Sequence, residues 1–409
     1  MRAYGAVTAA YWAFMLSDGA LRMLVLLHFN GLGFTPVQLA WLFLLYELAG
    51  VVTNLYAGFL AARFGLAATL YLGLGLQIAA LVALAQLDPG WSIAASVIFV
   101  TAVQGVSGVA KDLAKMSSKS AVKVLAPAGE GVLFAWVALL TGSKNAVKGL
   151  GFLLGAALLA WFGFQTAIWG MAGVLAAILL AIAAFLPKGL PMGRKEAKVT
   201  QVWSHNLRIN RLSLARMFLF GARDVWFVVG IPVYFQSVLS DGSPDSRRAA
   251  FFLIGGFMAV WTIAYGVVQA GAPRLLKARG LPEPAIIAKA VVWAGLLVPI
   301  PLTLAALALL PAAPWFTAVL VAGLLLFGFV FAINSAVHSY LILAFTSAER
   351  VTMDVGFYYM ANAAGRLMGT ALSGLSYQIG GLPLCLATAG VLAGASWLAV
   401  RRLTPQATG

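Results

Sequence analysis

Apolar runs of about 20 residues recur along the whole chain, and each is long enough to cross about 30 Å of hydrocarbon. The 409 residues are 62% hydrophobic and only 10% charged, with a mean hydropathy of +0.95. The runs are too long for membrane β-strands and do not alternate, so helices are expected to satisfy the backbone within lipid. The sequence therefore predicts an all-α integral membrane protein.

About twelve helices are expected from these runs and from the Gly-, Pro- and Asp-rich turns between them. The expected limits are 4–29, 36–61, 67–86, 91–114, 132–160, 164–186, 211–236, 250–272, 285–309, 315–345, 350–376 and 382–400. The first run is too long for the core of a signal peptide, so it is expected to be a span. We predict a six-helix bundle over 1–186, a basic cytoplasmic linker over 187–210 and a second six-helix bundle over 211–409.

Most of the 27 lysine and arginine residues lie at the termini and in the loops of one predicted side. The loops of the other side hold only Arg247 and Arg248. The positive-inside rule then predicts that both termini are cytoplasmic, in a multi-pass protein of the inner (cytoplasmic) cell membrane. The net charge of +15 is explained by this topology and by contact with the anionic lipid bilayer, so it does not indicate nucleic-acid binding.

Other basic residues lie inside the apolar runs, where a charge costs roughly 2.5–3.5 kcal/mol on the insertion scale. Lys144 and Lys148 are four residues apart, so they share a helical face and repel each other, and no acid on that helix can pair with either. The basic residues in the predicted spans are Arg22, Lys111, Lys144, Lys148, Arg216, Arg223, Lys289 and Arg366. The acidic ones are Asp18, Glu47, Asp112, Asp224 and Asp354.

This excess of positive charge favours an anionic solute in a central cavity. Lysine and arginine bind oxyanions through charge-assisted hydrogen bonds. The predicted substrate-binding residues are Arg22, Lys111, Lys144, Lys148, Arg223, Arg366, Asn145 and Asn362, with Ser143 and Asn334 as further neutral donors. Arg216 and Lys289 are expected to extend to the membrane surface instead.

The embedded acids allow two interpretations. Asp18, Glu47 and Asp224 are candidates for proton coupling. Alternatively, they are permanent partners of Arg22 and Arg223, and the spacing of Asp18 and Arg22 fits a local ion pair on one helix. The absence of an ATPase motif favours secondary transport, either proton-coupled or as uniport.

The two predicted halves resemble each other. The segments FMLSDGALRMLVLLHF and FLFGARDVWFVVGIPVYF begin the first and seventh helices, and in each an aspartate precedes a phenylalanine by eleven residues. Repeated halves of this kind are typical of the major facilitator fold. The segments 58–65 (GFLAARFG) and 103–108 (VQGVSG) resemble the loop and fourth-helix signatures of that superfamily. This resemblance implies transport by alternating access.

A closer resemblance extends over essentially the whole chain. The stretches SDGALRMLVLLHF, GVAKDLAKMSSKSAVK, LLTGSKNAVKGLGFLLGAALLA and FLFGARDVWFVVGIPVYF are similar to those of the ArsJ family of organoarsenical efflux permeases. The resemblance implies efflux of 1-arseno-3-phosphoglycerate and hence arsenate resistance. It also implies a functional partner, the glyceraldehyde-3-phosphate dehydrogenase that makes this compound from arsenate.

Cysteine content separates two kinds of arsenic cargo. Cys385 is the only cysteine, whereas trivalent arsenic is soft and prefers several thiolates. A pentavalent oxyanion is therefore expected rather than arsenite. The spacing of the three histidines fits no metal site, and no nucleophile motif is present, so we expect no metal, no cofactor and no enzyme activity. A carrier for another organic anion, such as a sugar phosphate or drug, and a non-transporting membrane scaffold remain alternatives.

Overall fold

The computed structural model describes residues 2–64, 66–125, 132–185, 203–276, 282–311, 313–346 and 351–403. Within these ranges the chain forms helices joined by short turns and contains no strand, which confirms the predicted all-α class. The predicted basic linker around Lys195 and the residue Arg350 lie outside the described residues. The side chains of the signature-like segment 58–65 lie outside them as well.

The helices follow the predicted apolar runs closely. Their bounds are α1 Arg2–Gly31, α2 Pro36–Phe64, α3 Leu66–Leu84, α4 Ile93–Leu125, α5 Val132–Phe185, α6 Leu207–Val225, α7 Ile231–Leu239, α8 Pro244–Leu275, α9 Glu283–Leu297, α10 Pro299–Leu307, α11 Trp315–Phe345 and α12 Val351–Arg401. A short π-helix, η2 (Trp226–Gly230), joins α6 to α7. The break between α9 and α10 falls at Pro299, which lacks the N–H that a continuous helix needs.

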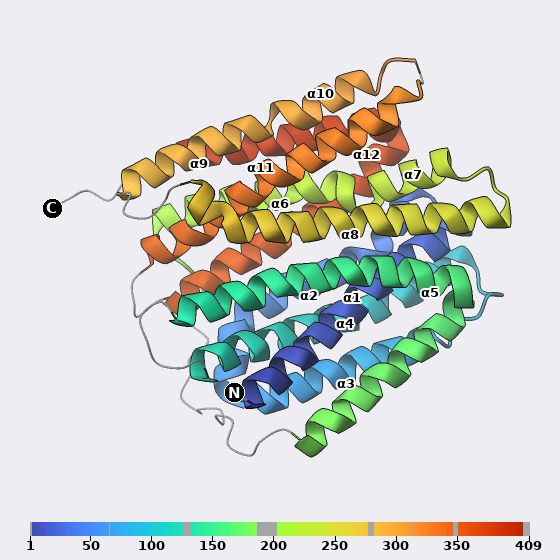
Figure 1. Cartoon of the computed structure of the whole chain (residues 1–409), viewed down its shortest axis with the longest axis horizontal. Coiled ribbons are helices and arrows are strands. Elements are labelled where there is room, and N and C mark those ends of the chain that lie inside the picture. The colour runs from blue at the N-terminus through green and yellow to red at the C-terminus, as the bar shows by residue number, and fades with distance from the viewer. Residues whose placement is uncertain are drawn as a thin grey trace. The chain divides into compact units, whose positions relative to one another are not determined.

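Ten stretches of the described residues are long and apolar enough to cross a membrane. Two of them, with 42 and 48 residues, are longer than one span needs. The first leaves the helical conformation at Gly163 (φ 73°) and the second at Gly381 (φ 61°), values that glycine adopts without strain. Figure 1 shows α5 turning back on itself. Both breaks fall where the sequence places a boundary between two helices, and the total of twelve spans stays a prediction.

The chain forms two compact units. The first comprises Met1–Phe34, Trp41–Val199 and Phe235–Ile263, and the second comprises Thr35–Ala40, Thr200–Tyr234 and Ala264–Gly409. These units group residues by proximity and not by chain order. The predicted division at 186 and 211 therefore stays a prediction.

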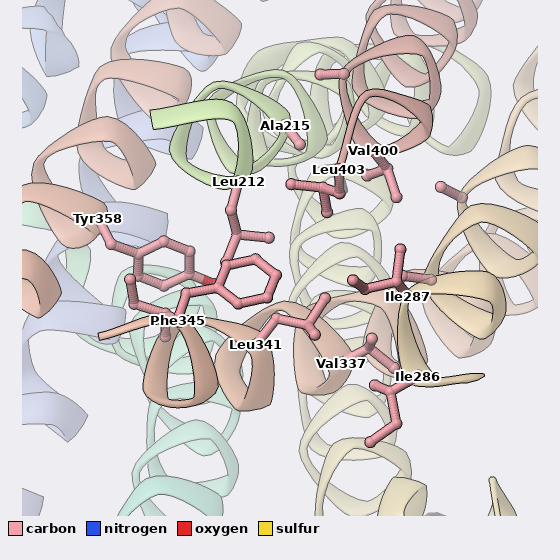
Figure 2. Packing of buried hydrophobic residues seen from close by; sticks show 14 of the residues in the cluster. Leu212, Ala215, Ile286, Ile287, Val337, Leu341, Phe345, Tyr358, Val400 and Leu403 are labelled. Atoms are coloured by element: carbon pink, nitrogen blue, oxygen red, sulfur yellow. The ribbon is translucent and has the colours of Figure 1, made fainter. Parts of the chain in front are cut away.

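The second unit has an apolar core where α6, α9, α11 and α12 meet. Figure 2 shows Phe345 of α11 beside Tyr358 of α12 and Leu212 of α6, with Ile286 and Ile287 of α9 on the other side of the cluster. All five side chains are at least nine-tenths buried. This packing holds α6 against its neighbours and thereby fixes the polar residues that α6 carries.

Glycines allow α1 and α5 to approach closely in the first unit. A methyl group on Gly19 would lie only 2.5 Å from the carbonyl oxygen of Lys148 and 3.2 Å from Cα of Gly151. Small residues at such positions let two helix backbones touch, as is common between membrane helices. The close approach brings Asp18, the neighbour of Gly19, next to Lys148.

Candidate functional site

Charged side chains from α1, α2, α4 and α5 meet inside the first unit, and we call this group the α1 cluster. Its members are Asp18, Arg22, Tyr46, Glu47, Lys111, Asp112, Lys115 and Lys148. A second group in the second unit, from α6, α11 and α12, is the α6 cluster. Its members are Arg216, Phe220, Arg223, Asp224, Ser335, Asn362 and Arg366.

Asp18 is held by two residues from other helices in the α1 cluster. The Lys148 ammonium donates to its carboxylate at 2.6 Å, and the Tyr46 hydroxyl donates at 2.5 Å. Asp18 is only 3% exposed, so both bonds act where water screens little. Lys148 thus pairs with an acid of α1, since its own helix offers none.

Arg22 also pairs across helices. Its Nη2 donates to Glu47 of α2 at 2.9 Å, and Glu47 is fully buried. The predicted local ion pair between Asp18 and Arg22 is thus wrong. The four-residue spacing permits that pair, but α2 and α5 each bring an opposite charge within hydrogen-bond distance. The interpretation of Asp18 and Glu47 as partners of buried cations fits this geometry.

Lys111 and Lys115 share the carboxylate of Asp112 on α4. The nitrogen–oxygen distances are 3.8 Å for Lys111 and 3.2 Å for Lys115. Lys111 is only 6% exposed, and its ammonium lies 4.1 Å from the centre of the Tyr46 ring, a cation–π contact. Tyr46 therefore binds Asp18 through its hydroxyl and Lys111 through its ring.

The other predicted residues on α5 lie one turn away from Lys148. Lys144 is partly buried and Asn145 is buried. The hydroxyl of Ser143 accepts a hydrogen bond from Trp12 of α1 at 3.0 Å. Asn334 differs from its predicted role as a donor to solute, because its amide donates to the backbone carbonyls of Trp293 and Val330.

In the α6 cluster, one carboxylate lies between two guanidinium groups. Asp224 contacts Arg223 at 2.5 Å and Arg366 of α12 at 3.4 Å. The helices meet here because Gly369 leaves room: a methyl group on it would lie 2.8 Å from Cβ of Asp224. Asp224 thus serves as a partner for the cations of its cluster, as one of the two interpretations expected.

Arg216 is the main residue whose role the sequence misjudged. It is 4% exposed, and its guanidinium lies over the rings of Phe220 and Tyr358. The expectation that Arg216 extends to the membrane surface is wrong. Its Nε donates to Asn362 at 3.0 Å and its Nη1 donates to Ser335, so tertiary packing holds it inside the unit.

Two hydroxyl-bearing residues of the clusters, Tyr46 and Ser335, were not predicted. Ser335 accepts from Arg216 and is also bonded to Tyr265 and Gln269. Tyrosine and serine are common in apolar helices, and nothing in their spacing distinguishes these two. Among the described residues, no group of three or more His, Cys, Asp or Glu side chains is arranged to hold a metal ion.

The sequence matches the family model of the Major Facilitator Superfamily over residues 7–304. The chain belongs to the major facilitator superfamily. It is therefore a secondary transporter and a multi-pass membrane protein, and not an enzyme. No curated protein matches the sequence.

Solved structures of major facilitator transporters share the fold of this chain. A POT family transporter in complex with a thioalcohol-conjugated peptide has a TM-score of 0.78 at 14% identity, with coverage of 100% of this chain and 97% of that one. A mutant of the nucleoside transporter NupG gives 0.70 at 16%, with 98% and 99% covered. The human organic anion transporter MFSD10 gives 0.61 at 18%, with the same coverage. At these identities the likeness concerns the fold alone.

A major facilitator carrier changes conformation in each transport cycle. Three ion pairs of the clusters join different helices: α1 with α5, α1 with α2, and α6 with α12. These three pairs therefore connect helices that belong to one unit each.

Proposed function

We propose that this carrier exports an organic oxyanion, with 1-arseno-3-phosphoglycerate as its cargo, and thereby confers resistance to arsenate. The proposed location is the inner (cytoplasmic) membrane, with both termini in the cytoplasm. Its functional partner is a glyceraldehyde-3-phosphate dehydrogenase that makes the cargo from arsenate. The specific cargo rests on the resemblance to the ArsJ family described above.

The charge balance of the two clusters carries the oxyanion proposal. Among the described residues of the two clusters, four carboxylates accompany seven basic side chains, so basic groups are in excess there. The acids are Asp18, Glu47, Asp112 and Asp224, and the basic residues are Arg22, Lys111, Lys115, Lys148, Arg216, Arg223 and Arg366. Buried charges are kept where something of opposite sign meets them, and a solute anion meets this requirement.

The chemistry of the cargo matches these groups. A phosphate and an arsenate ester are both tetrahedral oxyanions with several acceptor oxygens. Guanidinium groups bind such oxygens in pairs, and ammonium groups bind them as point charges. The single cysteine is unsuited to trivalent arsenic, because Cys385 is fully buried and its thiol is bonded to the carbonyl of Val225.

Transport into inside-out vesicles tests this proposal. Purified glyceraldehyde-3-phosphate dehydrogenase, glyceraldehyde 3-phosphate, NAD⁺ as the oxidant and arsenate generate the cargo outside the vesicles, and arsenic trapped inside is measured. We expect accumulation with the complete mixture and none when the enzyme is omitted. The Arg223→Gln carrier at matched protein level should accumulate at least about 10-fold less, since a charge-assisted hydrogen bond contributes about 1.5–3 kcal/mol.

Two results would contradict the proposal. One is accumulation of arsenite by the carrier alone, because it would mean a thiophilic cargo. The other is uptake of a radiolabelled sugar phosphate that exceeds uptake of the arsenic ester, because it would assign the carrier to a different organic anion. In cells, arsenate resistance should require both the carrier and the enzyme, and arsenite resistance should not change.

A further inference from the structure

Arg216 is a buried cation for which the described residues provide no carboxylate. Its partners are neutral: Asn362 accepts from Nε, and the carbonyl and hydroxyl oxygens of Ser335 accept from Nη1. Phe220 and Tyr358 cover it, with ring centres 4.2 Å and 5.1 Å from the guanidinium carbon. A guanidinium that is 4% exposed without a counter-charge carries a large desolvation cost. An anion that binds there would remove this cost.

Two nitrogen atoms at this position carry N–H groups that have no hydrogen-bond acceptor among the described residues. Among the described residues, Nη2 of Arg216 has no acceptor, and neither has the amide nitrogen of Asn362. Neither atom is among the fully enclosed polar atoms that lack a partner, so each retains some accessible surface. The bond from Nε to the Asn362 oxygen fixes the orientation of that amide, and its nitrogen is left to donate.

The position of Arg216 relative to Arg223 suggests the form of the ligand. Both guanidinium carbons lie over Phe220, at 4.2 Å and 4.8 Å from its centre, so they are at most about 9 Å apart. Their separation of seven positions corresponds to a rise of about 10 Å along α6, which puts them two turns apart near one face. A short molecule with an oxyanion at each end can span this distance.

We propose that Arg216 and Asn362 bind one oxyanionic head of a two-headed solute, while Arg223 binds the other head. This assignment rests on the proposed function and makes it more specific, because it names a residue pair that distinguishes two-headed from single-headed anions. Ser335 accepts a hydrogen bond from Arg216, and Tyr265 and Gln269 are bonded to Ser335, so these three residues position Arg216 and do not touch the solute.

Binding of two matched probes to the purified full-length carrier in nanodiscs tests this inference. The probes are propane-1,3-diyl bisphosphate, which has two phosphate heads, and propyl phosphate, which has one. We expect the wild-type carrier to bind the bisphosphate at least about 10-fold more tightly, since the second head adds charge-assisted hydrogen bonds. In Arg216→Gln this preference should disappear, because only Arg223 then remains to bind a head.

Two further variants separate binding from folding. Asn362→Asp keeps the acceptor for Nε and adds a carboxylate that competes with the solute, so it should remove the preference with no fall in melting temperature. Arg211→Gln is the matched control, because this arginine of α6 donates to the carbonyl of Arg402 outside both clusters. The Arg211→Gln carrier should prefer the bisphosphate as strongly as the wild type does.

The outcomes distinguish this inference from the proposed function. If the wild-type carrier binds both probes and Arg216→Gln and Asn362→Asp retain the preference, Arg216 is only a contact between helices and the inference is overturned alone. If the wild-type carrier binds neither probe, the oxyanion function fails and this inference fails with it. If Arg216→Gln does not fold, Asn362→Asp decides the question.

Discussion

At the scale of single residues, the structure changes the expected role of Lys148. Its 2.6 Å bond to Asp18 makes it half of a buried ion pair, with side-chain exposures of 15% and 2%. Such a pair contributes little net stability compared with apolar residues, but removal of one partner leaves a buried charge uncompensated. Lys148 therefore contributes to the stability of the fold, in addition to its predicted role in solute binding.

A double-mutant cycle tests this pairing. Lys148→Met should lower the free energy of unfolding by about 3 kcal/mol, because it leaves Asp18 charged and buried. Lys148→Met combined with Asp18→Asn should recover a large part of that loss. Melting temperatures in detergent measure the effect, with the exposed Arg248→Gln as a neutral control. If the losses of Lys148→Met and Asp18→Asn measured separately simply added in the double variant, the two residues would not be coupled.

At the scale of helices, close packing of α1 on α5 positions that pair. A methyl group on Gly19 would lie 2.5 Å from the carbonyl of Lys148, whereas one on Gly75 in α3 would meet nothing within 4 Å. The same substitution at these two glycines thus has opposite steric consequences, although both lie in apolar helices.

Gly19→Val should separate the two helices and cost about 1–3 kcal/mol through overpacking, with a lower melting temperature and reduced transport. The matched substitution Gly75→Val should change both by little, since its surroundings are open. Thermal unfolding and vesicle uptake at equal protein levels measure these effects. Equal losses of melting temperature and uptake in the two variants would show that neither stability nor transport depends on the close approach of α1 to α5.

At the scale of the whole molecule, the predicted topology places Lys195 in the cytoplasm and Arg248 outside. The native chain suits a labelling experiment, because its single cysteine, Cys385, is fully buried. Lys195→Cys should react with a membrane-impermeant maleimide in inside-out vesicles and not in intact cells. Arg248→Cys should show the opposite pattern. If both introduced cysteines reacted from the same side, the prediction that an odd number of spans separates positions 195 and 248 would be wrong.

The class of fold and the approximate positions of the helices follow from the sequence alone. Runs of apolar residues determine spans because lipid offers no partner to a backbone polar group. Glycines mark the breaks in α5 and α12, since only they adopt those dihedral angles without strain. The cationic character of the spans is also a property of composition, and the structure brings Arg22, Lys111 and Lys148 together in one cluster.

Only the tertiary structure decided which charges pair and which lie buried. Asp18 meets Lys148, 130 residues away, because glycines let α1 and α5 approach. Arg216 lies inside the second unit because Asn362 and Ser335, from two other helices, accept its hydrogen bonds. Residue spacing determines which side chains share one helical face, but the partner on a neighbouring helix depends on how the helices pack. Pairing in these clusters is therefore a property of the folded chain.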